Sequence, residues 1–264
     1  MTCNLDVASK FDLRREQGPF DIIGDVHGCL DELVELLGKL GYVSSLSDAA
    51  FSHPAGRKAV FLGDLVDRGP KVSQTLRLAM DMTRSGAAFC IPGNHDINFL
   101  RKLQGRDIPV RYGMDASLAQ LAKEPPEFAR EVCQFFDAMV SHYVLDGGRL
   151  VAAHAGIKES MQGVDSKEAR KFALFGETTG ETDEFGLPVR YNWAAEYRGP
   201  ATVVYGHTPV PEPVWLNNTI NLDTGCVYGG RLTALRYPER ELVSVPARQV
   251  YVVSARPFLR ARTR

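Results

Sequence analysis

The sequence lacks a long apolar run and any excess of charge of one sign. No apolar stretch approaches the roughly 20 residues that cross a bilayer, and the opening MTCNLDVASKFDLRRE has no signal-peptide core. The 31 basic and 32 acidic side chains nearly cancel, which excludes a polycation that binds nucleic acid through its overall charge. These absences predict a cytoplasmic protein without a membrane segment. A nucleic-acid substrate would have to be bound by a local group of side chains.

Cysteine is also scarce, and its spacing argues against a disulfide framework or a zinc knuckle. The five cysteines are odd in number, widely scattered and never in a CxxC pair. They are Cys3, Cys29, Cys90, Cys133 and Cys226. A reducing compartment is the expectation.

Apolar residues, by contrast, make up 44% of the 264 residues, which is ample for a core. Neither an internal repeat nor a low-complexity linker divides the chain. We therefore expect one domain over residues 18–246, preceded by an N-terminal extension (1–17) and followed by a basic C-terminal tail (247–264).

Three strand-loop-helix units follow one another in the first half of the chain. In each unit a short apolar run ends in a polar, glycine-containing loop, and a segment with apolar residues at helical spacing follows. The predicted strands and helices are 20–23 with 30–40, 59–62 with 72–83, and 88–91 with 97–103. Three such units in series predict a largely parallel sheet covered by helices.

The second half of the chain is richer in β-structure. Residues 115–140 predict a helical insertion broken at Pro125-Pro126, and a hairpin that turns at 146–148 follows it. Further strands are expected at 202–205, 219–222 and 231–237. Residues 158–200 are too polar and glycine-rich for a regular element, and a long ordered loop of this kind is usually functional.

Polar side chains collect where the predicted strands end. In open α/β sheets these carboxyl ends border the ligand crevice, so the side chains should converge in space. They are Asp25 and His27 after the first strand, Asp64, Asp67 and Arg68 after the second, Asn94, His95 and Asp96 after the third, and His154 and His207 after two later strands. A lone histidine after a strand is normally structural, and His53 and His142 keep that interpretation. Four of six histidines at strand ends indicate a functional site.

This donor set suits two divalent ions that share a bridging carboxylate and activate a water for attack on phosphorus. Oxygen and imidazole ligands without thiolate favour Mn²⁺, Fe or Zn²⁺ over copper or an iron-sulfur cluster. The residues by themselves therefore predict a two-metal hydrolytic site.

Three separated blocks resemble the signature of a known family. GDVHG (24–28), GDLVDRG (63–69) and GNHD (93–96) are similar, in the same order, to the blocks of the phosphoprotein-phosphatase type of calcineurin-like metallophosphoesterases. The resemblance implies an α/β fold in which a β-sandwich is flanked by helices. It also implies that one metal is held by Asp25, His27 and Asp64, and that Asp64 bridges to a second metal held by Asn94, His154 and His207.

The same resemblance makes His95 the general acid for the leaving oxygen, with Asp67 orienting it and Arg68 clamping phosphate. General chemistry agrees, because an Asp–His pair raises the basicity of the imidazole and a guanidinium fork matches phosphate oxygens. Asn94 is also expected to contact the substrate. Asp96 departs from the eukaryotic Ser/Thr phosphatases, which carry Glu there, and this weakens a protein-phosphatase interpretation.

A longer similarity covers residues 176–199 and 203–245, which resemble the phosphatase module of bacterial polynucleotide kinase-phosphatase. That family removes 2′,3′-cyclic phosphates and 2′- or 3′-phosphates from RNA ends with Mn²⁺ or Ni²⁺. The resemblance makes Asp223 of the DTG motif functional, and we expect it to support a ligand histidine. The kinase P-loop GxxxxGK[ST] is absent, so the chain would be an excised module or a free-standing relative. Kinase and ligase modules of an RNA repair system would then be its partners.

Healing of nucleotide or RNA ends is therefore the first of three predicted functions. Hydrolysis of dinucleoside tetraphosphates is the second, because bacterial enzymes of that type share the metal motifs and an ending like DTGCVYGG. Protein Ser/Thr phosphatase is the third. A non-catalytic scaffold is disfavoured because every ligand position is filled.

A polynucleotide enzyme should keep a basic or aromatic wall beside its site. One candidate wall consists of Arg190, Tyr191, Trp193, Tyr197 and Arg198, with Arg190 as a substrate contact. Alternatively, Trp193 and Tyr197 simply pack a helix against the core. The basic residues of the tail are Arg248, Arg256, Arg260, Arg262 and Arg264. Such a tail steers nucleic acid or is, more often, a solvated end.

Overall fold

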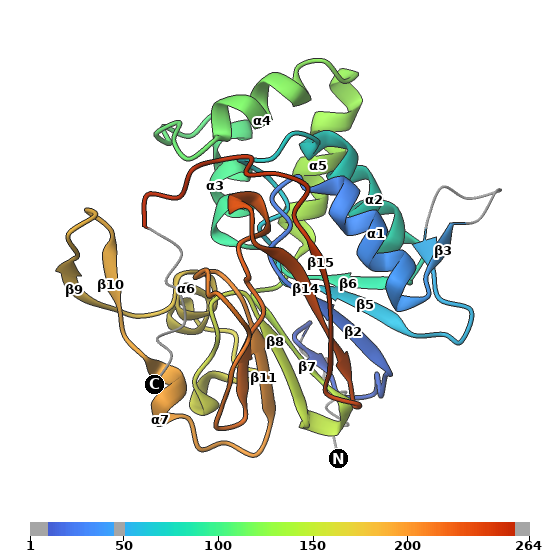
Figure 1. Ribbon diagram of the computed structural model, residues 1–264, viewed down its shortest axis with the longest axis vertical. Helices are drawn as coiled ribbons and strands as arrows, with labels where there is room; N and C mark the ends of the chain where they lie inside the picture. The colour runs from blue at the N-terminus through green and yellow to red at the C-terminus, as the bar shows by residue number, and fades with distance from the viewer. Residues whose placement is uncertain (1–9, 45–50, 257–264) are drawn as a thin grey trace, which may run out of the picture.

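Two β-sheets packed face to face form the centre of the computed structural model, which describes residues 10–44 and 51–256 (Figure 1). The first sheet has the strand order β15-β14-β2-β5-β6. Its strands are β2 (Phe20–Ile23), β5 (Lys58–Phe61), β6 (Ala88–Cys90), β14 (Arg231–Tyr237) and β15 (Glu241–Pro246). β2, β5 and β6 are parallel, as the strand-loop-helix units predict, whereas β14 runs antiparallel to both β2 and β15.

The second sheet has the strand order β1-β7-β8-β11-β13-β12. Its strands are β1 (Asp12–Leu13), β7 (His142–Leu145), β8 (Leu150–Ala153), β11 (Thr202–Tyr205), β12 (Trp215–Leu216) and β13 (Thr219–Asn221). β8, β11 and β13 are parallel, while β7 and β8 form the predicted hairpin, turning through a 3-10 turn at Asp146–Gly148. Both sheets are therefore mixed, and the expected β-sandwich is confirmed.

Alternation along the central strands explains the layers. Ile22 and Val60 point between the sheets and pack with Val204 and Ile220 of the second sheet. The neighbouring side chains on each strand point to the opposite face of the sheet. There Ile23, Ala59 and Phe61 pack under the helices. Strands that are covered on both faces are mostly apolar, as residues 59–62 are throughout. The exception in residues 20–23 is the buried Asp21, which pairs with Arg57 at 2.9 Å.

Helices cover the outer faces of both sheets (Figure 1). Over the first sheet lie α1 (Leu30–Leu40), α2 (Val72–Arg84), α3 (Asn94–Leu103), α4 (Met114–Leu121) and α5 (Pro126–Ala138). The predicted break between the last two is confirmed, because Pro126 occupies the first turn of α5, where its missing N–H costs nothing. Over the second sheet lie α6 (Lys167–Phe175) and α7 (Trp193–Glu196).

The prediction that residues 158–200 form no regular element is wrong. Ser166 caps α6 by accepting the N–H of Ala169, and the helix buries Phe172 and Ala173. A hairpin of β9 (Thr178–Thr182) and β10 (Pro188–Arg190) follows, and Figure 1 shows it projecting from the body. Its glycine and acidic content reflects a solvent-exposed hairpin rather than an irregular loop. A second small hairpin pairs β3 (Val43–Ser44) with β4 (Phe51–Ser52).

The chain after β15 lies against the body as far as it is described. The N–H groups of Tyr251 and Val252 both donate to the carbonyl of Val227, and Arg256 pairs with Asp183 of the projecting hairpin. Cys3, Arg260, Arg262 and Arg264 lie outside the described residues. The division into extension, domain and tail therefore stays a prediction.

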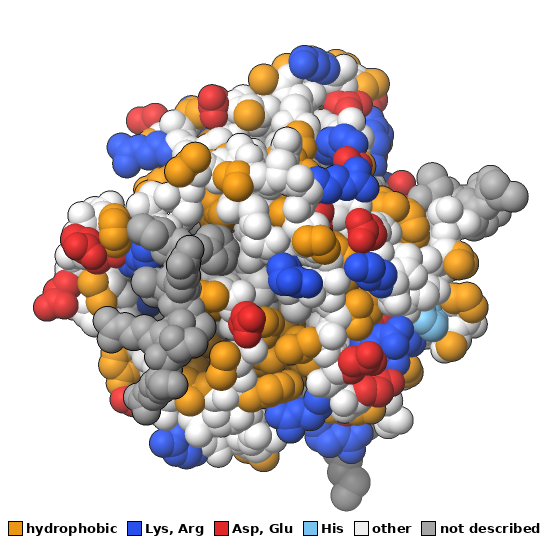
Figure 2. All heavy atoms as spheres, in the orientation of Figure 1, with side chains coloured by type: hydrophobic (Ala, Val, Ile, Leu, Met, Phe, Trp, Pro, Cys, Tyr) orange, Lys and Arg blue, Asp and Glu red, His pale blue; other side chains and the backbone are white. Residues whose placement is uncertain are grey.

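The surface that Figure 2 draws carries basic and acidic side chains interspersed, without a continuous basic stripe among the side chains described on that face. Within residues 10–44 and 51–256, no helix combines the length and the apolarity needed to span a bilayer.

Candidate active site

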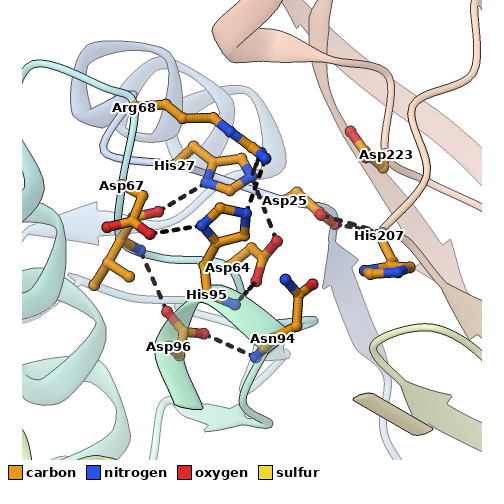
Figure 3. Close-up of polar contacts among 12 residues, drawn as sticks. Asp25, His27, Asp64, Asp67, Arg68, Asn94, His95, Asp96, His207 and Asp223 are labelled. Carbon is orange, nitrogen blue, oxygen red and sulfur yellow. Dashed lines mark hydrogen bonds and ion pairs between the residues drawn. The ribbon is translucent and has the colours of Figure 1, made fainter. Parts of the chain in front are cut away.

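The predicted site residues converge at one edge of the sandwich, where loops from both sheets meet (Figure 3). Each parallel strand contributes through the residues that follow it, as the position of a ligand crevice in such sheets requires. The contributing residues are Asp25 and His27 after β2, Asp64, Asp67 and Arg68 after β5, His154 after β8, His207 after β11, and Asp223 after β13. Asn94, His95 and Asp96 differ from the prediction, since they form the first turn of α3 rather than a loop.

Backbone strain is concentrated at this edge. Five non-glycine residues of the site adopt positive φ, a conformation that costs on the order of 1 kcal/mol or more for a residue with a Cβ. They are His27 (φ 45°), Asp64 (φ 49°), Asp67 (φ 69°), Arg68 (φ 70°) and His207 (φ 75°). Glycine is needed where backbone approaches a carboxylate, because a Cβ on Gly93 would lie 2.0 Å from Asp64 Oδ1. The fold tolerates this strain at the positions that present the polar side chains.

One group of donor atoms combines Asp64 with His27 and His95. His27 Nε2 lies 3.4 Å from Asp64 Oδ2, and its Nδ1 lies 2.7 Å from the carbonyl oxygen of Val66. A carbonyl only accepts, so Nδ1 carries the proton and the lone pair of Nε2 faces Asp64. Asp25 is not part of this group of donor atoms; its carboxylate accepts the backbone N–H of His207 at 3.1 Å.

A second group combines the same Asp64 with His154 and His207. His154 Nδ1 lies 2.8 Å from the carbonyl oxygen of Leu62, which again leaves the Nε2 lone pair free to face the site. That Nε2 atom is 3.1 Å from Asn94 Oδ1, 3.1 Å from His207 Nδ1 and 3.6 Å from Asp64 Oδ1. Asp64 is thus the carboxylate common to both groups, one oxygen facing each.

The electrostatics of the cluster favour cations. Burial lowers the pKa of His27, His154 and His207, so all three imidazoles are neutral donors near pH 7. Burial and the neighbouring carboxylates raise the pKa of Asp25. Burial also acts to raise the pKa of Asp64, but the surrounding histidines and Arg68 outweigh it and lower that pKa below its ordinary value. Carboxylates crowded in a buried space are stabilised when a cation lies between them.

The donor set fits two divalent ions. Oxygen and imidazole donors without thiolate converge in two groups that share one carboxylate, which is the arrangement of a two-metal site. His207 Nε2 is buried without a hydrogen-bond partner among the described residues. A buried ring nitrogen without a partner is costly unless it binds something else.

His95, a member of the first donor group, is held in a chain of hydrogen bonds. Its Nδ1 is 2.6 Å from Asp67 Oδ2, and the other oxygen of Asp67 accepts the hydroxyl of Ser117 at 2.8 Å. The Ser117 hydroxyl also accepts the backbone N–H of Asp67 at 2.9 Å. The arrangement fixes the ring and leaves His95 Nε2 facing the open side of the cluster. Ser117 comes from α4, fifty residues beyond Asp67, and no local sequence signal marks it.

Arg68 reaches over the two histidine rings (Figure 3). Its Nη1 and Nη2 atoms lie 2.5 Å and 2.8 Å from the Nε2 atoms of His27 and His95. Its guanidinium also lies 5.3 Å from the ring centre of Tyr228, in a cation–π contact. The fork therefore stands at the open side of the cluster, where it can meet an anionic ligand.

Asp96 supports the loop after β5. One carboxylate oxygen accepts the N–H groups of Leu65 at 2.9 Å and Val66 at 3.3 Å, and the other accepts the N–H of Gly93 at 2.8 Å. A fully buried carboxylate that accepts three backbone N–H groups holds the Asp64 loop to the start of α3.

Asp223 departs from its predicted role, whereas the substrate contact of Arg190 stays a prediction. The Asp223 carboxylate accepts the N–H of Gly225 at 3.0 Å within its own turn, and no described bond joins it to a histidine. Burial raises the pKa of Asp223 to about 7, so it stands among the crowded carboxylates. The Arg190 guanidinium donates to the carbonyl of Phe175, and its charge contributes to the lowered pKa values of His154 and His207. Arg190 is therefore near the second group without contacting it.

The aromatic wall divides into buried and exposed members. Trp193 and Tyr197 are 7% and 4% exposed and pack with Phe172 on the second sheet, which confirms the packing alternative for these two rings. Tyr191 is 37% exposed.

Comparison with known proteins shows which family and which relatives this chain resembles. The family model described as calcineurin-like phosphoesterase matches residues 18–239. The asymmetrical bis(5′-nucleosyl)-tetraphosphatase PrpE of Anoxybacillus flavithermus is 45% identical over 244 residues, which cover 90% of this chain and 99% of that protein. The enzyme of the same name from Bacillus subtilis is 42% identical over 236 residues, covering 88% and 96%.

Among solved structures, a crystal structure of a putative diadenosine tetraphosphatase superposes with a TM-score of 0.62. It is 29% identical and covers 89% of this chain and 96% of that one.

Proposed function

The chain belongs to the calcineurin-like phosphoesterases, metal-dependent hydrolases of phosphate esters, and we propose that it hydrolyses bis(5′-nucleosyl) tetraphosphates asymmetrically. The observation that carries the substrate class is the similarity to tetraphosphatases over nearly their whole length, at 45% and 42% identity. A phosphoric anhydride between two nucleotides is a substrate that this site can bind through its donor groups and its guanidinium fork.

The proposed metal ligands combine the motif resemblance with the two groups of donor atoms. Asp25, His27 and Asp64 hold one divalent ion, and Asp64 with Asn94, His154 and His207 holds the other. When bound, such ions supply a nucleophile at neutral pH and neutralise charge on the phosphoryl group. This donor set suits Mn²⁺, Fe or Zn²⁺, and we propose manganese among them.

The remaining side chains handle the phosphate and the leaving group. Arg68 directs its two terminal nitrogens at the Nε2 atoms of His27 and His95, and in the substrate complex the same fork would make a bidentate contact with a pair of phosphoryl oxygens. His95, held through Nδ1 by Asp67, presents Nε2 to donate a proton to the departing oxygen. The acceptor Asp67 stabilises the imidazolium before the proton is transferred.

The RNA-end function predicted from residues 176–245 is not supported by the comparisons, which instead favour the second of the predicted functions. The interspersed charges of Figure 2 also provide no continuous basic track on that face for a polynucleotide backbone. Manganese-dependent cleavage of cyclic nucleotides is therefore an outcome to be tested beside the proposal.

Product analysis tests the asymmetric cleavage. The manganese-loaded protein should convert diadenosine tetraphosphate into ATP and AMP, and chromatography of the products should show them in equal amounts. Two molecules of ADP would mean symmetric cleavage. No turnover with any divalent metal would remove the proposal.

Ser117→Ala should reduce turnover of diadenosine tetraphosphate about 10-fold, the lower end of the effect of removing an outer hydrogen-bond partner. The substitution removes both hydrogen bonds between Ser117 and Asp67, so Asp67 holds His95 less firmly. Steady-state kinetics should show the loss in kcat, with metal content unchanged. Unchanged kcat would mean that Asp67 is positioned without Ser117.

A further inference from the structure

A cavity of about 500 Å³ opens on the side of the second sheet that α6 and α7 cover. It is formed by the turn at residues 158–160 and by residues 191–198. The lining side chains that matter here are Lys158, Tyr191, Trp193, Glu196, Tyr197 and Arg198. Its volume is within the range of small-molecule sites.

Trp193 joins this cavity to the proposed metal centre. A Cβ on Gly156 would lie 2.0 Å from Cζ2 of Trp193, so the indole covers that glycine directly. The other side of the indole meets Tyr205, with 5.1 Å between ring centres. Gly156 follows His154 by two residues and Tyr205 precedes His207 by two, and two residues span at most about 7 Å of chain. Trp193 therefore connects the cavity to the two chain segments that carry His154 and His207.

The charges of the cavity select the kind of ligand. Lys158 and Arg198 are balanced by the carboxylates of Glu159 and Glu196, and Lys158 already pairs with Glu177 at 2.7 Å. With as many carboxylates as cations, the lining has no excess positive charge that would hold a polyphosphate. Aromatic faces with nearby hydrogen-bond acceptors suit a flat, uncharged ring that carries amino groups.

We propose that this cavity binds the nucleoside at one end of the dinucleoside tetraphosphate, with its base stacked on Tyr191, while the polyphosphate lies at the Asp64 centre. The inference rests on the proposed function, because only a substrate with a nucleoside beyond the reacting phosphates reaches both places. It gives the half-exposed Tyr191 a role in specificity, and the buried Trp193 a role as the wall between the two subsites.

Fluorescence tests the cavity without any turnover. The chain has two tryptophans, Trp193 and Trp215, so Trp215→Phe leaves Trp193 as the single reporter. Adenosine added to the manganese-loaded variant should change the emission of Trp193 in a saturable way. Adding Tyr191→Ala should weaken binding at least about five-fold, the effect of losing about 1 kcal/mol of base stacking.

Phe185→Ala is the matched control, since Phe185 is an exposed aromatic of the projecting hairpin that precedes Tyr191 and does not line the cavity. It should bind adenosine as the parent does. Saturation-transfer NMR on proteins that retain Trp215 gives the same comparison if the tryptophan variant does not fold. Absence of saturable binding, or equal affinity in the Tyr191→Ala and Phe185→Ala proteins, would overturn the proposal.

Kinetics separates this inference from the proposed function. Tyr191→Ala should raise the KM for diadenosine tetraphosphate by the same factor as it weakens adenosine binding, and Phe185→Ala should not. Hydrolysis of diadenosine tetraphosphate with an unchanged KM in Tyr191→Ala would refute the cavity and leave the proposed function intact. Adenosine binding that depends on Tyr191 in a protein that does not cleave diadenosine tetraphosphate would refute the function and leave the cavity.

Discussion

Asp64→Ala is expected to lose both metal ions and nearly all hydrolysis of diadenosine tetraphosphate. Its two carboxylate oxygens face the two donor groups separately, at 3.4 Å from His27 Nε2 and 3.6 Å from His154 Nε2. Removing a single group that stabilises charge in an active site costs about 10²–10³-fold, so losing the shared ligand of both ions should cost more. Metal content by mass spectrometry and kcat on the same sample measure the two effects together.

The control is Asp31→Asn, a partly exposed carboxylate on α1 that pairs with Lys71 and Arg248. Exposed ion pairs contribute about 0–1 kcal/mol, so this variant should keep its fold, both ions and its activity. Circular dichroism should show that Asp64→Ala remains folded. A folded Asp64→Ala protein that kept both ions and full turnover would contradict the bridging role.

His95→Ala is expected to keep both ions yet lose about 10²–10⁴-fold in kcat for diadenosine tetraphosphate, the typical contribution of general acid catalysis. The imidazole is held by Asp67 at 2.6 Å and points Nε2 at the open side of the cluster, which suits proton donation better than metal binding. p-Nitrophenyl phosphate should suffer less, because its leaving group needs little protonation.

His53→Ala serves as the control for this prediction, since the His53 ring packs on Tyr42 outside the site. It should leave both rates unchanged. If His95→Ala slowed the nucleotide and the aryl phosphate by equal factors, the assignment of His95 as general acid would fail. Loss of one ion would instead place His95 among the metal ligands, as its position in the first donor group allows.

The positions of the polar residues could be predicted because they depend on local pattern. Each short apolar run ends a buried strand, and the residues that follow it must lie at the carboxyl edge of the sheet. Asp25, Asp64 and His154 are therefore placed by sequence alone. The sequence does not indicate that α3 begins at Asn94, because the segment GNHD resembles a turn. In the structure the side chain of Asp96 caps the helix by accepting the backbone N–H of Gly93.

Long-range features could not be predicted in this way. Ser117 bonds to Asp67 across fifty residues, and β14 joins the first sheet by pairing with β2 although more than two hundred residues separate them. The resemblance predicts that Asp223 supports a ligand histidine, but its carboxylate accepts the N–H of Gly225 within its own turn. The resemblance of residues 176–245 also favours RNA ends, whereas the relatives that match nearly the whole chain are tetraphosphatases.

The most direct test is a comparison of kcat/KM for one purified, manganese-loaded sample with diadenosine tetraphosphate, a 2′,3′-cyclic nucleotide and a phosphopeptide. The site and the relatives predict the highest value for diadenosine tetraphosphate, cleaved to ATP and AMP. A higher value for the cyclic nucleotide or the phosphopeptide, with diadenosine tetraphosphate left intact, would contradict the account.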